Sequence, residues 1–343
     1  RLAAAGYLGG ARVIGFQRDT CGTGQLGDSF RLTLDYSVPN AGPATLIAKF
    51  ASQDPTSREF GRSSGYYRSE IQFYQQLAPR LPVEVPVAVH AALSQDGADF
   101  VLLMEDLAPA KQVDQLVGCS ADDSARVMEQ AAALHAASWQ DGNLAAVDWL
   151  KGTVGLFNQV TDNLAGVIGN LPTLCGDLVD AADLAEAAKI VPYTAQWKQV
   201  IAEPQCLWHS DLRADNVLFD AAHGRRPVVV LDWQGLGFGR GSMDIALWLG
   251  TSMALEERRR HERDLVAHYH QMLVRGGVQG YSAEQCWQDY RLHALHGLIV
   301  GVFGVGAVKR TPRGDRMWKT WIERTAAQVR DLGSIGVLAQ AGA

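Results

Sequence analysis

Two short segments constrain this chain more than any others: HSDLRADN at residues 209–216 and the run VVVLD at 228–232. Gly224 lies eight residues from both Asn216 and Asp232. A hairpin centred on that glycine would make Asn216 and Asp232 cross-strand neighbours, with Cβ atoms about 5 Å apart. An amide oxygen beside a carboxylate is a hard ligand pair that suits Mg²⁺ bound together with phosphate oxygens. We therefore expect a magnesium site at the open end of this hairpin.

Asp211 lies five residues before Asn216, on the loop that leads into the hairpin. From there its carboxylate could receive a proton from an attacking hydroxyl group. The pattern His-x-Asp-x-x-x-x-Asn followed by a metal-binding Asp is the spacing of a kinase catalytic loop. The alternative is a β-hairpin with polar ends and an Asp that caps a helix. Because both halves occur on one hairpin, we favour the catalytic interpretation.

A glycine-rich segment, CGTGQLG at 21–27, contains the pattern Gly-x-Gly-x-x-Gly. A dinucleotide-binding fingerprint needs a helix after the glycines, whereas a kinase phosphate loop needs a strand. The alternating run RLTLDY that follows predicts a strand, so the second interpretation is preferred to an ordinary turn. We expect Gly22, Thr23, Gly24 and Gly27 to form a loop whose backbone N–H groups approach nucleotide phosphates.

Lys49 lies in an alternating run after the glycine loop, and Glu70 lies on the helix predicted next. A Lys–Glu pair in this order would hold the ammonium group toward the α- and β-phosphates of ATP. The alternatives are a solvated lysine at a strand end and a carboxylate that stabilises a helix N-terminus. The run VLLMEDL at 101–107 ends the N-terminal part, and there the backbone groups of Glu105 and Leu107 are the expected partners of an adenine ring.

The pattern of apolar and polar residues changes near residue 105. Before it, alternating runs predict strands at 12–18, 30–36, 45–50 and 100–104, a helix at 67–77, and a loop rich in Ser, Gly and charge at 51–65. After it, helices are expected near 121–139, 155–168, 176–200, 254–275, 282–300 and 311–331, around a small β segment at 206–233. The prediction is an α+β chain with a β-rich N-lobe at 1–104 and a larger helical C-lobe at 105–343.

Composition narrows the possible functions of these 343 residues. The net charge of −6 gives no basic field for a nucleic acid or an anionic membrane, and apolar residues at 47% are ordinary for a globular protein. The longest apolar run, 297–308, is shorter than the roughly 20 residues of a membrane span and predicts a buried helix. Five widely spaced cysteines without a Cys-x-x-Cys pair favour a reducing cytoplasm over disulfides or zinc.

Taken together, these motifs resemble the aminoglycoside phosphotransferase and choline-kinase-like superfamily, specifically its bacterial ecdysteroid-kinase-like branch. The matching pieces occur in the family's order from residue 20 to about residue 250: CGTGQLGDSF, IAKF, YRSEIQFYQQLAP, LLMEDLAPA, LHAASW, HSDLRADNVLFD and VVLDWQGLGFGRGSMDIALWL. The resemblance implies a bilobal protein-kinase-like fold. It also implies Mg²⁺-dependent transfer of the ATP γ-phosphate to a hydroxyl group of a small molecule.

Carried over to this sequence, the resemblance makes Asp211 the catalytic base and Asn216 and Asp232 the Mg²⁺ ligands. It places Lys49 on the α- and β-phosphates, with Glu70 orienting it and Gly22, Gly24 and Gly27 in the phosphate loop. Ser210 stands where the family commonly has Gly, a change from which little effect is expected. Arg213 is expected to touch the transferring phosphoryl group, and a structural salt bridge is the alternative.

Two further positions have structural expectations. Asp244 resembles a family position that packs against the catalytic loop. His135, which lies on a predicted helix among apolar residues, is expected to be a hydrogen-bonded core histidine rather than a base.

The acceptor is less well defined by the sequence. Residues 285–343 carry four acidic and eight basic side chains, which disfavours a polycationic aminoglycoside and also choline. We expect a neutral or anionic hydroxylated metabolite, with no nucleic acid or membrane partner. Two other functions remain open: a nucleotide-binding pseudokinase scaffold without catalysis, and a protein kinase. Against the protein kinase, the chain lacks an Ala-Pro-Glu segment after Asp232 and has no room for a long activation loop.

Overall fold

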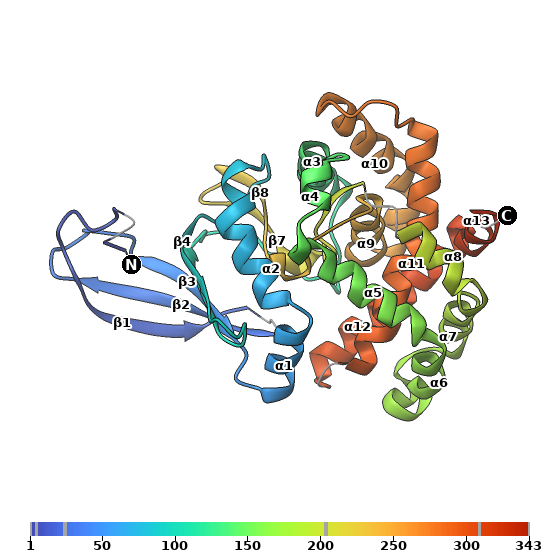
Figure 1. Cartoon of the computed structure of the whole chain (residues 1–343), viewed down its shortest axis with the longest axis horizontal. Coiled ribbons are helices and arrows are strands. Elements are labelled where there is room, and N and C mark those ends of the chain that lie inside the picture. The colour runs from blue at the N-terminus through green and yellow to red at the C-terminus, as the bar shows by residue number, and fades with distance from the viewer. Residues whose placement is uncertain (1, 4–5, 23–25, 202–204, 308–309, 342–343) are drawn as a thin grey trace. The chain divides into compact units, whose positions relative to one another are not determined.

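The computed structural model of the chain describes residues 2–3, 6–22, 26–201, 205–307 and 310–341. The chain divides into two compact units (Figure 1). The first comprises Arg1–Ala110 together with Asp220–Leu236, and the second comprises Lys111–Phe219 together with Gly237–Ala343. The boundary therefore crosses the segment 209–232, which carries the motifs singled out in the sequence.

The first unit is built on a five-stranded antiparallel sheet in the order β1-β2-β3-β5-β4. Its strands are β1 (Val13–Thr20), β2 (Gly27–Tyr36), β3 (Thr45–Ala51), β4 (Ala88–Leu93) and β5 (Phe100–Glu105). The four strands predicted from alternation are confirmed. Strand β4 was not predicted, because AVHAAL has no alternation and its residues are all half-buried.

The helical part of the first unit departs from the sequence prediction in two places. Residues 51–65, predicted as a loop, contain helix α1 (Pro55–Ser63), because Asp54 caps the N–H of Ser57 and Pro55 occupies the first turn. The helix predicted at 67–77 is α2 (Tyr66–Gln72), which continues as a π-helical turn over Phe73–Leu77. Helix α2 packs against β4 and β5.

Residues 220–236 belong to the sheet unit although they come more than a hundred residues after it in the chain. Strand β7 (Val217–Ala221) and strand β8 (Arg226–Val230) form the expected two-stranded sheet, with positive φ angles in its turn. The indole of Trp233 stacks on the ring of Phe73 at 3.9 Å between centroids. The N–H of Val230 donates to the carbonyl of Glu84. These contacts place Asp232 in the same unit as Lys49.

The second unit is mostly helical (Figure 1). Its helices of eight or more residues are α3 (Ala121–Ala137), α5 (Gly152–Asp162), α6 (Leu164–Cys175), α7 (Ala181–Ala188), α8 (Thr194–Ile201), α9 (Ser242–Ser252), α10 (Leu255–Arg275), α11 (Ala283–Ala307), α12 (Pro312–Leu332) and α13 (Ser334–Ala341). The helices expected at 155–168 and 176–200 are each two helices, α5 with α6 and α7 with α8. A short two-stranded sheet joins β6 (Cys206–Trp208) to β9 (Gly237–Gly239).

Helix α9 forms the centre of the second unit, because all of its residues are buried. Helices α11 and α12 pack against it and against each other. The apolar run at 297–307 lies on α11, as predicted, and its glycines let α12 approach closely. No helix in the part of the chain that the structure describes is both long and apolar enough to cross a membrane. All five cysteines are free thiols.

The contact between α11 and α12 yields a test of the fold. A Cβ atom on Gly301 would lie 2.7 Å from Cδ1 of Trp321, a fully buried indole whose N–H donates to the Gly297 carbonyl. We expect Gly301→Ala to lower the free energy of unfolding by about 1–3 kcal/mol through overpacking. The measurement is the urea midpoint.

Gly166→Ala is the matched control for this substitution. Gly166 lies inside α6, and a Cβ atom added there would meet no other atom within 4 Å. Alanine at this position should therefore raise stability by about 0.5–1 kcal/mol through helix propensity. Equal urea midpoints for the two variants would contradict the close approach of α11 and α12.

Candidate active site

A buried carboxylate fixes the backbone of the loop that carries Asp211. Asp244, at the start of α9, accepts the N–H of His209 at 2.7 Å on Oδ2 and the N–H of Ser210 at 2.8 Å on Oδ1. Its side chain is 1% exposed, so both bonds lie away from water. Burial alone would raise the pKa of Asp244, but hydrogen bonds from His135 and from the His209 backbone hold that pKa below its usual range.

His135 completes this support from helix α3. Its Nε2 lies 3.2 Å from Oδ2 of Asp244, and its Nδ1 lies 2.8 Å from the hydroxyl of Tyr269 on α10. The imidazole is fully buried. Both sequence expectations are confirmed here: Asp244 packs against the loop, and His135 is a hydrogen-bonded core histidine.

Ser210 has a left-handed backbone conformation, with φ at +69°. This region costs an L-residue roughly 1–2 kcal/mol and is open to glycine without that cost. The conformation explains why glycine suits this position, and the hydrogen bond from Ser210 N–H to Asp244 holds the strained turn. The sequence analysis expected little effect of serine because its side chain is small. The strain in the backbone at this position could not be inferred from the sequence.

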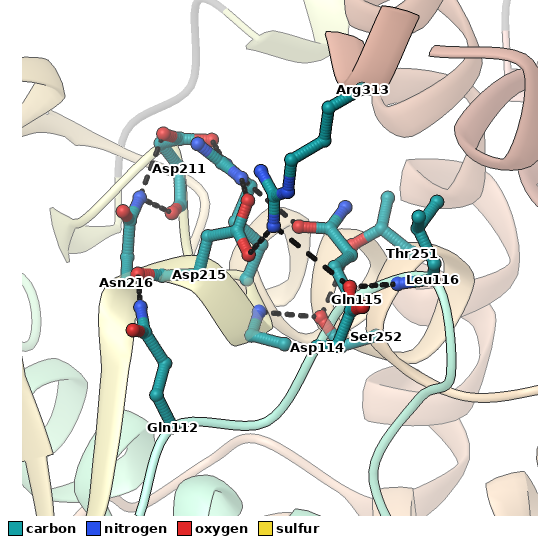
Figure 2. A network of polar contacts seen from close by, with 12 residues as sticks. Gln112, Asp114, Gln115, Leu116, Asp211, Asp215, Asn216, Thr251, Ser252 and Arg313 are labelled. Atoms are coloured by element: carbon teal, nitrogen blue, oxygen red, sulfur yellow. Dashed lines mark hydrogen bonds and ion pairs between the residues drawn. The ribbon is translucent and has the colours of Figure 1, made fainter. Parts of the chain in front are cut away.

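The carboxylate of Asp211 lies between two donors in the second unit (Figure 2). Its Oδ1 accepts the Nε–H of Arg213 at 3.0 Å, and its Oδ2 accepts Nδ2–H of Asn216 at 2.8 Å. The same Asn216 nitrogen donates to the Asp211 carbonyl at 2.8 Å. The side chain of Asp211 is 38% exposed. Two bonds thus fix the orientation of a carboxylate that solvent and a substrate can still reach.

Arg213 connects Asp211 to a network of polar side chains. Its NH1 donates to Oε1 of Gln115 at 3.0 Å and to Oδ2 of Asp215 at 2.7 Å, and its guanidinium lies over the ring of Trp321. Arg313 extends from α12 toward Asp215, as Figure 2 shows, with 3.6 Å between NH2 and Oδ1. These contacts are the ones expected if Arg213 forms a structural salt bridge, which is the alternative role given in the sequence analysis. The predicted contact of Arg213 with a phosphoryl group stays a prediction.

The segment that supplies Gln115 is itself held in place. Arg324 of α12 donates to the carbonyls of Gln115 and Thr251, and its NH2 donates to the Leu116 carbonyl at 2.8 Å. Gln112 donates to the carbonyl of Asp215 at 3.1 Å. The segment that supplies Gln115 is therefore anchored to α9 and α12.

In the first unit, Lys49 lies between two carboxylates. Its Nζ is 2.8 Å from Oε1 of Glu70 and 2.8 Å from Oδ1 of Asp232. Burial alone would lower the pKa of Lys49. The negative charges of Asp232 and Glu70 outweigh this effect of burial and raise the pKa of Lys49. Burial raises the pKa of Glu70, which is 1% exposed. The predicted Lys–Glu pair is present, and Asp232 joins it.

Asp232 combines strain with partial exposure. Its backbone is left-handed, with φ at +61°, and its side chain is 30% exposed. Non-glycine residues in this region cluster at functional sites, where the surrounding structure holds them. Asn216 belongs to the second unit and Asp232 to the first, so their predicted proximity stays a prediction.

The glycine loop is described in part. Gly22 has φ at +78°, and Gly27 begins β2 so close to β3 that a Cβ atom would lie 2.9 Å from the Phe50 carbonyl. Glycine is therefore favoured at Gly22 by the backbone conformation and required at Gly27 by the close approach of β3. Thr23 and Gly24 lie outside the described residues.

At the end of β5, both predicted backbone positions are engaged. The N–H of Glu105 donates to the Val87 carbonyl, and the carbonyl of Leu107 accepts the N–H of Ala222. A carbonyl oxygen can accept a second hydrogen bond. The contact of Glu105 and Leu107 with an adenine ring stays a prediction.

Two histidines of α11, His293 and His296, are buried, and one of them contacts the loop that carries Asp211. His296 donates to the Ser210 backbone carbonyl, and Nδ1 of His293 lies 2.7 Å from the hydroxyl of Ser242. Burial lowers the pKa of His296 to about 4 and that of His293 well below its usual range. Both rings are therefore neutral at physiological pH.

Several residues of the site were missed from the sequence. Gln115 is separated from Arg213 by 98 positions, and no pattern in its segment marks it. Asp215 lies beside Asn216 and could have been noted as a second carboxylate on the loop. Among the described residues, no group of three or more His, Cys, Asp or Glu side chains has the geometry of a metal site.

The sequence matches a profile of the ecdysteroid kinase-like family over residues 25–277. This match covers well over half of the chain. We found no sequence match to a curated protein.

Solved kinases share the fold at low sequence identity. The Plasmodium vivax ethanolamine kinase matches with a TM-score of 0.55 and 10% identity, over 94% of this chain and 83% of that one. A microcompartment-associated aminopropanol kinase matches with a TM-score of 0.53 and 17% identity, over 98% of both chains. A variant of aminoglycoside 2'-phosphotransferase-IIIa, solved with GDP, gives 0.50 and 13%, over 94% and 93%. The fold is therefore protein-kinase-like, as predicted.

The strain at Ser210 can be measured by comparing two substitutions. Ser210→Gly and Ser210→Ala both remove the hydroxyl, but only glycine also removes the Cβ atom that disfavours φ at +69°. We expect the glycine variant to be more stable than the alanine variant by about 1 kcal/mol, after the extra chain entropy of glycine. Guanidinium unfolding measures this difference, and an alanine variant as stable as the glycine variant would show that the turn is unstrained.

The buried His296 predicts a pH dependence of stability. Its pKa is lowered from 6.5 to about 4 in the folded protein, so the unfolded chain binds a proton that the folded chain resists. The contribution of the neutral His296 ring to the free energy of unfolding is therefore fully present above pH 6.5, and it is lost as the pH is lowered from 6.5 toward 4. His296 should contribute about 2 kcal/mol to the fall between pH 7.5 and 5.

The measurement is urea unfolding of the wild type and of His296→Gln at pH 7.5 and at pH 5. Between these pH values the variant should lose about 2 kcal/mol less of its free energy of unfolding than the wild type does. His268→Gln is the control, because His268 is partly exposed and lies 3.3 Å from Glu129 on the surface. If His296→Gln keeps the full pH dependence of the wild type, the buried ring is not its source.

Proposed function

Because the chain belongs to the ecdysteroid kinase-like family, we propose that it transfers the γ-phosphate of ATP to a hydroxyl group of a small metabolite or natural product. One observation carries the proposal: the partly exposed carboxylate of Asp211, fixed by Arg213 and Asn216 on a loop that the buried Asp244 holds. A carboxylate in this setting can accept the proton of an attacking hydroxyl. Its orientation is set before any acceptor arrives, which lowers the entropic cost of reaching the reactive geometry.

Lys49 and Glu70 are proposed to bind the phosphates of the nucleotide. The ammonium group is buried and fully charged between two carboxylates, so it can turn toward α- and β-phosphate oxygens without a change in protonation. Gly22, Thr23, Gly24 and Gly27 are proposed to let backbone N–H groups approach the phosphates. Glu105 and Leu107 are proposed to contact the adenine through their backbone groups. We propose the same division of roles along the chain, with nucleotide binding at 1–104 and the catalytic loop, metal site and acceptor cleft at 105–343.

The donor chemistry of Asn216 and Asp232 fits Mg²⁺. Nδ2 of Asn216 makes two hydrogen bonds to Asp211, which directs Oδ1 of the amide away from that carboxylate and leaves an oxygen to offer. Asp232 contributes a carboxylate that is 30% exposed. Bound Mg²⁺ would neutralise charge on the phosphate oxygens. Arg213, which holds Asp211, is proposed to reach the transferring phosphoryl group as well.

The acceptor is proposed to be neutral or anionic, as the basic balance of residues 285–343 indicates. A catalytically silent pseudokinase is the alternative, but the presence of Asp211, Asn216 and Asp232 together disfavours it. A protein kinase is disfavoured further, because α9 begins ten residues after Asp232 and leaves no room for an activation loop.

Two substitutions separate the proposed roles. Asp211→Asn keeps the shape of the side chain but removes the proton acceptor, so phosphate transfer should fall by about 10²–10⁴-fold while Mg·ATP binding stays within about twofold. Asp232→Asn should weaken Mg·ATP binding by about tenfold or more. Calorimetry measures binding of Mg²⁺ with a non-hydrolysable ATP analogue. Mass spectrometry of pooled hydroxylated metabolites, incubated with ATP and Mg²⁺, detects any species that gains one phosphoryl group.

Asp220→Asn is the control, since Asp220 is exposed on the same hairpin and has no proposed role. It should leave both measurements unchanged. Equal binding and equal transfer in the Asp211 and Asp232 variants would contradict the assignment. Binding without transfer by the wild type, across chemically diverse pools, would favour the pseudokinase.

A further inference from the structure

One face of the sheet in the first unit carries both Lys49 and Arg31. In the register of β2 and β3, Arg31 lies directly opposite Ile47, two residues before Lys49. Side chains two residues apart on a strand point to the same face, and so do those directly opposite on the neighbouring strand. The side chain of Arg31 therefore shares the face of the lysine that is proposed to bind phosphates.

Arg31 is fixed by an ion pair with Asp106, the residue that follows β5. Nε of Arg31 lies 2.6 Å from Oδ2 of Asp106, and NH2 lies 3.3 Å from Oδ1. The carboxylate also accepts the N–H of Ala108 at 3.1 Å. The side chain of Asp106 is 5% exposed, whereas that of Arg31 is 43% exposed. The pair is thus covered at the carboxylate and open at the guanidinium.

The guanidinium is a permanent cation in this position. The hydrogen bond to Asp106 and the negative charge of that carboxylate raise the pKa of Arg31. Burial alone would raise the pKa of Asp106, but hydrogen bonds from Arg31 and from the Ala108 N–H hold that pKa below its usual range. Because a bidentate pair uses N–H groups in the plane of the guanidinium, the flat faces of the group take no part in it.

The charges around Arg31 do not suit a phosphate group. Asp19 of β1 lies directly opposite Arg31 in the antiparallel register, and its charge also raises the pKa of the arginine. Two carboxylates therefore flank one guanidinium, so the local charge is negative. An anionic group would be repelled here, whereas an uncharged ring that stacks on the guanidinium adds no charge.

Two apolar side chains lie between Arg31 and Lys49 on this face. Ile47 is opposite Met104 in the register of β3 and β5, so their side chains share the face that carries Arg31. Both are half-buried. The next pair along these strands, Lys49 with Leu102, is buried. The face therefore presents a partly open apolar surface beside a planar cation.

The order of these groups along β3 matches the order of the parts of a nucleotide. Lys49, the proposed phosphate ligand, lies four residues after Thr45, or about 13 Å along the strand. The Thr45 side chain hydrogen-bonds to Asp106. Asp106 in turn lies between the two residues whose backbone is proposed to contact adenine. The ion pair of Arg31 therefore lies at the end of the face where a base is expected.

We propose that the guanidinium of Arg31 stacks on the base of the bound nucleotide, and that Asp106 holds the guanidinium in position. The inference rests on the proposed function and adds a side chain to base contacts that otherwise come from backbone groups alone. An arginine stacks on an aromatic ring because its charge is attracted to the π-electrons and the guanidinium is weakly hydrated. The in-plane bonds to Asp106 stay intact when a base lies on the flat face.

Stacking can be observed directly at the Nε–H group of Arg31. The ¹⁵N-labelled full chain is titrated at neutral pH with Mg²⁺ and a non-hydrolysable ATP analogue, and separately with Mg²⁺ and tripolyphosphate, which has no base. Arg31→Lys identifies the Arg31 signal by its loss, and Asp106→Asn identifies it independently by removing the charge beside it. We expect the ring current of the stacked base to move this signal upfield with the ATP analogue, and tripolyphosphate to leave it in place.

A matched pair of variants tests the contribution of Arg31 to affinity. Arg31→Lys keeps a positive charge beside Asp106 but loses the plane, so calorimetry should show about fivefold weaker binding of the ATP analogue with Mg²⁺. Arg18→Lys is the control. Arg18 lies on β1 opposite Leu32, hence on the other face of the sheet, where its guanidinium lies over the ring of Phe30. This variant should bind the analogue as the wild type does.

Three results would overturn the proposal. The first is binding of the ATP analogue without a change in the Arg31 signal. The second is an equal shift with tripolyphosphate, which would mean that Arg31 responds to phosphate rather than to the base. The third is an Arg31→Lys variant that binds the analogue no more weakly than Arg18→Lys does.

The outcomes separate this proposal from the proposed function. Binding of the analogue without a shift would overturn the stacking and leave the kinase standing, since phosphate transfer is measured separately. An upfield shift in a chain that transfers no phosphate would support the base contact and favour the pseudokinase. No binding of the analogue at all would contradict the proposed function, and this inference with it.

Discussion

The carboxylate of Asp244 is the constraint on which the loop that carries Asp211 depends. It accepts the backbone N–H groups of His209 and Ser210 and is in turn held by His135, all within a fully buried region. Removing one partner of such a buried set leaves a charged group without compensation, which is far more costly than losing a surface ion pair. Because α9 carries Asp244 and is itself buried on every side, the position of Asp211 is tied to the core of the second unit rather than to solvent-exposed loops.

The charged residues of the proposed site fall into two sets. In the second unit, Asp211 is held by Arg213 and Asn216, and Arg213 is held by Gln115 and Asp215. In the first unit, Lys49 is held by Glu70 and Asp232. The boundary between the units passes through the hairpin strand β7, so one segment of some twenty residues contributes members to both sets. Each set is internally paired in its own unit, which means that the geometry of each is preformed without help from the other.

Much of the fold could be predicted from local sequence. Alternation predicted β1, β2, β3 and β5, and the helix expected near 121–139 is α3. Helix α1 was missed although Asp54 and Pro55 form a helix start, because the Ser and Gly content of that segment outweighed the cap. Strand β4 was missed because half-buried residues on both faces leave no alternation. Within the site, the roles of Asp244 and His135 were predicted and observed, whereas Gln115 carries no local signal, since its importance comes from a contact across 98 positions.

The sequence by itself determined the chemistry that this protein has available: a carboxylate and an amide at fixed spacing and a lysine after a glycine-rich segment, in a chain that matches the ecdysteroid kinase-like family over residues 25–277. These are local features, set by residue type and by distance along the chain. Only the tertiary structure decided which polar groups are buried without a hydrogen-bond partner and which are fixed by hydrogen bonds. The strained φ of Ser210, whose N–H bonds to Asp244 of α9, and the neutral ring of His296, which is buried on α11, both depend on the tertiary fold. Desolvation and close approach depend on neighbours that are distant in sequence, and for that reason no local pattern could have revealed them.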